Sequence, residues 1–204
     1  MKNFRVAFAL AGVFLGSTLS GVEGKVEDMT TRVEFPDKVV FESGEKPIEM
    51  KATGVATRSK FFVKVYSVAH YMQDPVPGDT KKISEEVCDK TKAKQLTLTW
   101  VRGVDAKRIQ EGFQESFEKT MSRADHEKLL SEITQFNAFF DKDAKEGDRY
   151  VIRWIPEGTI EVEVNGKKKG EINNTEFAAA TWGIWLGPKS IVNRTKLVSL
   201  IAGQ

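Results

Sequence analysis

Residues 54–72 place the strongest constraint on what this chain can fold into. They read GVATRSKFFVKVYSVAHYM, with apolar side chains on both of the faces that a strand presents. Alternate residues of a strand share a face, so one face carries Phe61, Val63, Val65, Ala69 and Tyr71, and the other carries Phe62, Lys64, Tyr66, Val68, His70 and Met72. A strand that is apolar on both faces is covered on both sides. The sequence therefore predicts one long central strand, which ends at the proline-rich turn of residues 74–79.

Further strands are indicated on both sides of this segment. Residues 33–42 alternate weakly around Pro36, which favours an edge strand or two short strands. Residues 95–101 and 150–154 alternate clearly. The pair Asn165-Gly166 between residues 159–164 and 167–172 predicts a two-residue hairpin.

Helices are indicated by apolar residues at i, i+4 spacing. Asp105 is expected to begin a helix with Ile109, Phe113, Phe117 and Met121 on one face. Other helices are expected at residues 83–92, 124–141 and 175–185, and from Ser190 onward. The order of strands, helices, strands and helices predicts an α+β fold, in which helices pack on one face of a large antiparallel sheet.

Residues 1–24 have the three parts of a secretory signal peptide. Lys2 and Arg5 give a cationic start, an uncharged apolar stretch follows, and small residues come next. Cleavage is expected after Ser20 or Gly24, with a retained membrane anchor as the alternative. The apolar stretch is short for a bilayer span, and residues 25–204 contain no other such stretch. We therefore expect export to the periplasm of one domain, residues 25–204, without a stable membrane span.

The composition excludes several classes of function. With 31 Lys and Arg against 29 Asp and Glu, the net charge of +2 lacks the basic excess of a nucleic-acid binder. The single cysteine excludes an internal disulfide and any multi-cysteine metal site. Two histidines leave little for a histidine-rich metal site. We therefore expect no metal and no cofactor, which leaves arginine, tyrosine and backbone groups to form a site.

His70 and Cys88 are assigned structural roles. His70 has no histidine at i, i+4 spacing, and His126 lies on a distant helix, so packing is expected for His70. Cys88 has no neighbouring base to activate it, which favours a buried or half-buried structural thiol.

Arg58 is the most informative single residue. It stands between Gly54 and the two-sided part of the strand, where the chain enters the sheet. A guanidinium in a cleft of low dielectric binds a carboxylate or phenolate through two parallel hydrogen bonds. The alternative is an exposed arginine at the start of a strand.

Several short motifs occur in an order that resembles one protein family. Residues 54–66 (GVATRSKFFVKVY) are followed by AHYM at 69–72, Gly103, Gly147-Asp148, IPEGT at 155–159, VNG at 164–166 and WLG at 185–187. Over residues 45–203 this series is similar to the chalcone isomerase-like family, and most resembles its exported bacterial branch. The resemblance implies an open-faced β-sandwich, with a large antiparallel sheet layered with helices and a ligand cleft between them.

The resemblance also implies where catalytic residues would lie. The plant enzymes of the family close a chalcone to a flavanone with an arginine, a threonine, a lysine, a tyrosine, an asparagine and a C-terminal hydroxyl. Here Arg58 matches the arginine, and Tyr66 takes the place of the threonine. The lysine, tyrosine and asparagine are not retained, and the remaining places fall near Thr97, at Asp105 or Ala106, at Gly112 or Phe113, and near Ser190.

Non-enzymatic plant relatives bind fatty acids, with an arginine and a tyrosine holding the carboxylate. The leading hypothesis is accordingly an exported protein that binds a small hydrophobic anion, a fatty acid or a phenolic compound. One alternative is an isomerase (an intramolecular lyase) that acts on a chalcone-like or other enone substrate, with Arg58 as the catalytic residue. A second alternative is a structural or partner-binding protein with a filled cleft.

The ligand-binding hypothesis assigns some residues to the anionic group of the ligand and others to its apolar part. Arg58 is expected to hold the anion, and Tyr66 or Tyr71 to donate a hydrogen bond to it. The apolar wall is expected to consist of Val68, Leu98 and Phe113.

Overall fold

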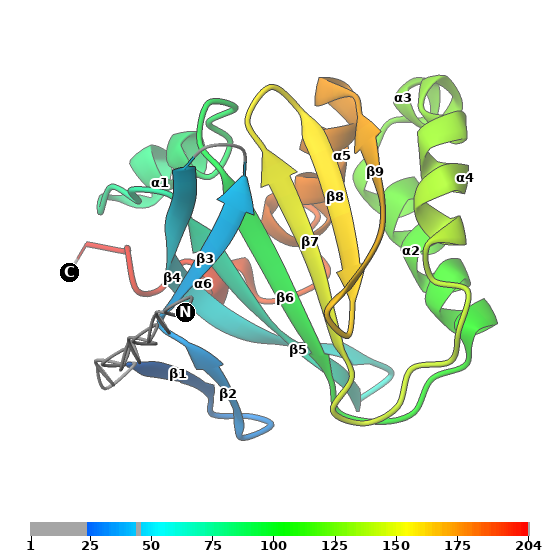
Figure 1. Cartoon of the computed structure of the whole chain (residues 1–204), viewed down its shortest axis with the longest axis horizontal. Helices are drawn as coiled ribbons and strands as arrows, with labels where there is room; N and C mark the ends of the chain where they lie inside the picture. Colours follow the sequence, from blue (N-terminus) through cyan, green and yellow to red (C-terminus); the bar gives the residue numbers. More distant parts are fainter. Residues whose placement is uncertain (1–23, 44–45, 204) are drawn as a thin grey trace, which may run out of the picture.

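A meander of antiparallel strands forms the main sheet. The computed structural model describes residues 24–43 and 46–203, so nearly all of the predicted signal peptide lies outside the described residues. Within the described residues, seven strands pair in chain order (Figure 1). They are β3 (Lys38–Ser43), β4 (Lys46–Lys60), β5 (Val63–Met72), β6 (Lys94–Trp100), β7 (Arg149–Ile155), β8 (Thr159–Val164) and β9 (Lys167–Asn173).

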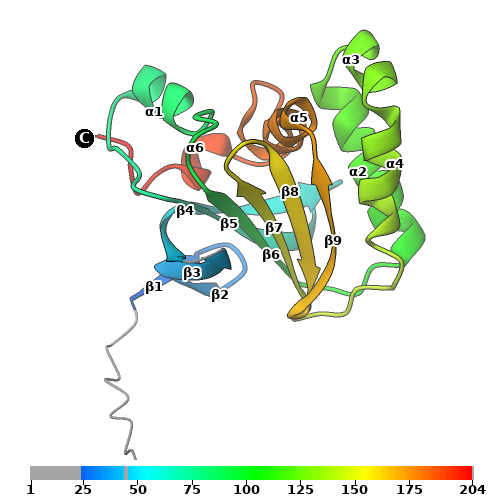
Figure 2. The same cartoon turned by 45° about the horizontal axis from the view of Figure 1, so that its top comes forward.

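The helices cover one face of this sheet, and a two-stranded hairpin covers part of the other (Figure 2). The hairpin consists of β1 (Lys25–Asp28) and β2 (Val33–Pro36). The helices are α1 (Thr80–Glu86), α2 (Ala106–Thr120), α3 (Arg123–Lys128), α4 (Leu130–Ala138), α5 (Thr175–Leu186) and α6 (Arg194–Leu197). The predicted α+β fold with an antiparallel sheet layered with helices is confirmed. Within the described residues, no helix is long and apolar enough to cross a membrane.

Strand β5 is buried on both faces, as its sequence predicts. Tyr66 and Val68 belong to the larger core beneath the helices. Ala69 and Tyr71 point the other way and join Phe35 of β2 in a second, smaller core. Alternation along one strand thus divides its side chains between two separate apolar clusters.

The single long strand predicted for residues 54–72 is wrong, because the chain turns back at Phe61 and Phe62. Strands β4 and β5 form a hairpin, and these two residues have φ values of 50° and 65°. Turns of this left-handed kind normally use Asn and Gly, as the β8–β9 hairpin does at Asn165 and Gly166. The segment has no such residue at its turn, so the local sequence gave no turn signal.

Three helix predictions need smaller corrections. The helix expected at residues 124–141 is divided at Leu129 into α3 and α4. The last helix is only the short α6. Helix α1 ends at Glu86, so Cys88 lies in the following turn and is exposed, contrary to the buried or half-buried thiol that we expected.

A buried chain of hydrogen bonds ties the sheet to the C-terminal helices. The indole N–H of Trp182 donates to Nε2 of His70 at 3.2 Å, which leaves the His70 proton on Nδ1, 2.7 Å from Oγ1 of Thr53. The Thr53 hydroxyl in turn donates to the carbonyl oxygen of Leu197 at 2.9 Å. Burial, with a smaller effect of Lys94, lowers the pKa of His70 to about 3. His70 is therefore a neutral, fully bonded core residue.

Candidate functional site

A cavity of about 560 Å³ lies between helix α2 and the ends of β4, β5 and β6. This is where a cleft between sheet and long helix was expected, and the volume falls in the range of small-molecule sites. Its lining includes buried apolar and aromatic side chains from both layers: Tyr66, Trp100, Ile109, Phe113 and Ile191. The third hypothesis, a protein with a filled cleft, predicted that this space would be closed.

Three of the lining residues stand in one row across the sheet. Arg58 of β4 pairs with Tyr66 of β5, and Tyr66 pairs with Trp100 of β6. Between Arg58 and Ser59 the register shifts, so that Val65 is an extra residue on β5. A β-bulge of this kind redirects side chains, and both Val65 and Tyr66 line the cavity. A guanidinium, a phenol and an indole are thereby brought to the same wall.

Arg58 is half-buried and holds its position through backbone bonds. Its Nη1 donates to the carbonyl oxygens of Ile191 at 2.9 Å and Ser59 at 3.2 Å. In the described part of the chain no carboxylate lies within 4.0 Å of it, and its Nε and Nη2 have no hydrogen-bond partner. The guanidinium therefore keeps two unbonded donors on one edge, and among these residues no salt bridge engages it.

Tyr66 is buried and lines the cavity. The hydroxyl oxygen accepts a hydrogen bond from the indole N–H of Trp185 at 3.0 Å. Burial raises the pKa of Tyr66 to about 12, although the charge of Arg58 and the Trp185 bond act in the opposite direction. The phenol consequently stays protonated at neutral pH, and its O–H proton has no acceptor among the described residues.

Trp100 is a lining residue that sequence reasoning missed. Its ring packs edge-on against Tyr66, with 5.5 Å between the ring centroids. Its indole Nε1 is buried and has no hydrogen-bond partner in the described residues. Most buried donors are bonded, so this N–H is a candidate third donor. The sequence pattern placed Trp100 at the end of an alternating strand, but only the pairing of β5 with β6 brings it beside Tyr66.

Charged side chains surround the mouth of the cavity and mostly pair with one another. Nε of Arg108 lies 3.5 Å from Oδ2 of Asp105. Nζ of Lys60 lies 2.6 Å from Oε2 of Glu115. Arg102 has no carboxylate within 4.0 Å in the residues that the structure describes. The cations without an acidic partner at this mouth are thus Arg58 and Arg102, which gives it a positive bias toward an anion.

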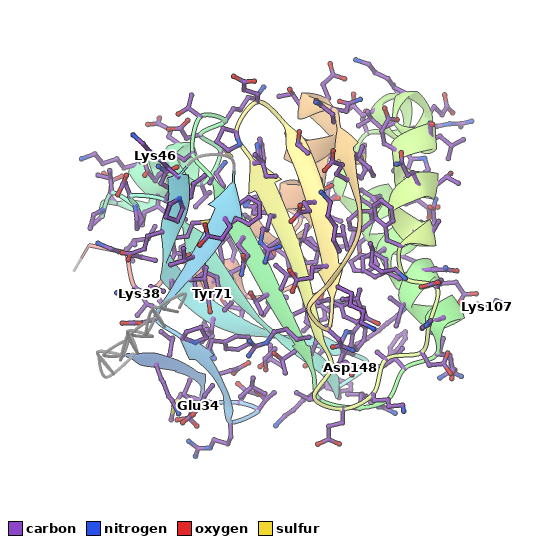
Figure 3. The ribbon with its side chains drawn as sticks, in the orientation of Figure 1. Glu34, Lys38, Lys46, Tyr71, Lys107 and Asp148 are labelled. Carbon is purple, nitrogen blue, oxygen red and sulfur yellow. The ribbon has the colours of Figure 1, made fainter. Side chains whose placement is uncertain are left out.

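Three of the predicted ligand-binding residues do not line the cavity. Val68 and Leu98 are fully buried in the core next to it. Tyr71 faces the opposite side of the sheet, where its hydroxyl donates to the carbonyl oxygen of Pro36 at 3.0 Å and burial raises its pKa. In Figure 3 it lies beside β3, far from the start of α2 that Lys107 marks. Of the predicted set, the structure brings Arg58, Tyr66 and Phe113 together.

The residues at the positions of the other plant catalytic residues do not form a comparable catalytic site. Thr97 points to the outer face of the sheet, where its hydroxyl accepts from Gln95. Asp105, Gly112 and Phe113 line the cavity, but only Asp105 is polar and it pairs with Arg108. The Ser190 hydroxyl bonds to the backbone carbonyl oxygens of Trp185 and Val192. The features that this chain shares with the plant catalytic set are therefore an arginine, Arg58, and a hydroxyl group, that of Tyr66.

Comparison with known proteins places the chain in a family. A family model described as chalcone isomerase-like matches residues 28–197. Among solved structures, the crystal structure of a fatty-acid binding protein from Arabidopsis thaliana is similar to this chain, with a TM-score of 0.70 and 14% sequence identity. The match covers 87% of this chain and 96% of the plant chain. No curated protein matches the sequence. The chain belongs to the chalcone isomerase-like family.

Proposed function

We propose that this chain is an exported protein that binds a hydrophobic monoanion, a fatty acid or a phenolic acid, in the cavity beside α2. The observation that carries the proposal is the free edge of Arg58 at the wall of a cavity that is partly lined by apolar side chains. A cation held by backbone carbonyls, with no carboxylate beside it among the described residues, is suited to an anion from outside. The apolar part of the lining is suited to the remainder of such a ligand.

The geometry of the donors favours a carboxylate. Because Nη1 of Arg58 is bonded to Ile191, Nε and Nη2 remain as a parallel pair, which matches the two oxygens of a carboxylate. The Tyr66 hydroxyl can add a third hydrogen bond. Its oxygen accepts from Trp185, but its O–H proton has no acceptor among the described residues and is free to be donated to a ligand. Phe113, Ile109 and Ile191 then offer apolar surface to a chain or ring.

The similar plant protein supports the same class of ligand. It is a fatty-acid binding protein, and it shares the fold over nearly its whole length. In this chain, the residues that line the cavity between sheet and helices favour an anionic ligand.

Mass spectrometry of small molecules extracted from protein purified from its native host is the direct test. We expect a hydrophobic acid in the wild-type protein and its loss from Arg58→Ala. Arg102→Ala is the matched control, because it removes a positive charge at the mouth without touching the Arg58–Tyr66 pair. Unchanged ligand content in Arg58→Ala would refute the assignment of the anchor.

A titration with a fluorescent polyene fatty acid gives the size of the effect. Loss of the guanidinium is expected to weaken binding about a hundred-fold, or about 3 kcal/mol, as for other charge pairs that lose one partner. Arg58→Lys should bind with intermediate strength, because it keeps the charge and loses the paired donors. The corresponding fatty alcohol should bind the wild-type protein weakly.

An isomerase is the second candidate, since the same row of donors could polarise an enone carbonyl. Arg58 and Tyr66 would stabilise negative charge that develops on the oxygen. Ring closure bleaches the chromophore of a chalcone, so absorbance reports turnover directly. A rate above buffer that disappears in Arg58→Ala would favour this function, and no rate with several chalcones would favour binding alone.

The export part of the proposal rests on residues 1–24. Fractionation of the native host, with sequencing of the mature N-terminus, tests it. We expect the mature chain in the periplasm, beginning at Gly21 or Lys25.

A further inference from the structure

The turn between β4 and β5 exposes three apolar residues in succession. Phe61 is 85% exposed, Phe62 is fully exposed, and Val63 is 42% exposed. The turn lies at the end of the sheet away from α1, and Figure 1 draws it in cyan. Single exposed apolar residues are common, but two adjacent phenylalanines at the tip of a hairpin are not explained by packing within this chain.

The backbone of this turn is also unfavourable for the residues that occupy it. Phe61 and Phe62 have φ values of 50° and 65°, a region that bulky residues rarely adopt. The chain uses Asn165 and Gly166 for the equivalent turn of the β8–β9 hairpin. Stability of the fold alone would thus favour small or polar residues at both turns, so the two phenylalanines call for a role outside the folded chain.

The hairpin that carries the tip is positively charged. Arg58, Lys60 and Lys64 lie on the same hairpin, and residues 58–64 contain no carboxylate. Lys60 contacts Glu115 of α2, whereas Lys64 donates to the backbone carbonyl of Thr30. Aromatic rings that project between cations are typical of segments that bind the surface of an anionic membrane.

The tip and the cavity are continuous. Phe61, Val63 and Lys60 line the cavity mouth, together with Arg58. A surface that receives the two phenylalanines would therefore lie directly against the opening. For a protein whose ligand has an apolar chain, this arrangement lets the chain pass between a bilayer and the cavity without crossing water.

We propose that the β4–β5 turn is a membrane-docking element, which inserts Phe61 and Phe62 into the surface of a phospholipid bilayer containing anionic headgroups. Docking depends on the two phenylalanines and on Lys60 and Lys64, whereas the ligand proposed above depends on Arg58 and Tyr66. The passage of ligand rests on the proposed function, but docking to vesicles that contain no free fatty acid does not.

Sedimentation with vesicles tests docking directly. Wild-type mature chain is mixed with vesicles of phosphatidylcholine and phosphatidylglycerol, and the bound fraction is measured against lipid concentration. The informative variant is Phe61→Asn with Phe62→Gly, which installs the residues of the chain's other hairpin turn. We expect at least a ten-fold loss of vesicle affinity together with a higher melting temperature, a combination that misfolding cannot produce.

Two controls separate the contributions. Leu130→Ser removes a 51% exposed apolar residue at the start of α4 and should leave vesicle binding unchanged. Raising the salt concentration, or omitting phosphatidylglycerol, should weaken wild-type binding because screening reduces the attraction of the lysines. Phe62→Gly alone changes a residue that does not line the cavity. This single variant should lose vesicle affinity and still bind the fluorescent fatty acid in buffer, which distinguishes failure of docking from failure of the ligand site.

Two outcomes would overturn the proposal. One is equal vesicle binding by the wild-type chain and the double variant. The other is a lipid-independent dimer that the double variant abolishes, since the phenylalanines would then belong to an interface between two copies of the chain.

Discussion

Arg58 and Tyr66 occupy directly paired positions on β4 and β5, and both line the cavity beside α2. The phenol lies close enough to the guanidinium for the positive charge to act on its pKa. A ligand carboxylate on the free edge of Arg58 would thus have a second donor beside it. The hairpin that creates this pair also carries the exposed phenylalanines at its turn.

Replacing Tyr66 with Phe should weaken both the ligand site and the core. Loss of a hydrogen bond to a charged group is expected to reduce fatty-acid affinity by about 1.5–3 kcal/mol, or about ten- to a hundred-fold. The same change leaves the indole N–H of Trp185 without its acceptor, which should lower the free energy of unfolding by about 1–3 kcal/mol. Fluorescence titration and urea denaturation measure the two effects separately. Full affinity in a less stable variant would show that the hydroxyl serves only Trp185.

Ligand affinity should be constant from about pH 6 to pH 10. A guanidinium stays charged over this range, and because burial raises the pKa of Tyr66 to about 12, the phenol keeps its proton as well. Below about pH 5 a carboxylic acid ligand takes up a proton and loses its attraction to Arg58, so affinity should fall. Titrations with the fluorescent fatty acid across this range check the profile. A loss of affinity between pH 7 and pH 9 would mean that another group controls binding.

Acid should destabilise the fold through His70. The folded chain keeps His70 neutral down to a pKa of about 3, whereas the unfolded chain protonates it near 6.5. The unfolded state therefore binds more protons between these values, and His70 contributes full stability above about pH 6.5 that is lost as the pH falls toward 3. The expected slope is about 1.4 kcal/mol for each pH unit between pH 6 and pH 4.

Denaturation of His70→Asn across the same range provides the comparison. The variant should be less stable at pH 7, because Trp182 and Thr53 lose their partners. It should also have a shallower dependence on pH than the wild-type protein. Parallel curves for the two proteins would contradict a buried, neutral His70.

Gly54→Ala should strongly destabilise the protein. A Cβ at this position would lie 2.2 Å from the carbonyl oxygen of Lys196 and 2.6 Å from the carbonyl carbon of Leu197. These are backbone atoms, so α6 would have to move away from β4, at a cost of about 1–3 kcal/mol. Gly183→Ala is the control, because a Cβ there has nothing within 4 Å and lies inside helix α5. Thermal denaturation should show a lower melting temperature for the first variant and an equal or higher one for the second.

The sequence by itself determined the features that depend on neighbours a few residues away. The alternation of residues 63–72 determined which side chains face each core, so it also placed Tyr71 opposite Tyr66. Asn165-Gly166 specified its hairpin because those residues tolerate the left-handed backbone, with φ values of 50° and 77°. The ordered motifs indicated the family, and with it the fold, whereas the role of Arg58 stays a prediction.

Only the tertiary structure decided how the site is assembled. The turn at Phe61 and Phe62 requires a left-handed backbone that phenylalanine disfavours, so it forms because β4 and β5 pair as antiparallel strands. The carbonyl that positions Arg58 belongs to Ile191, 133 residues away, and Trp100 reaches Tyr66 only through the pairing of β5 with β6. Such contacts depend on how strands and helices pack over long sequence separations, and no local pattern records them.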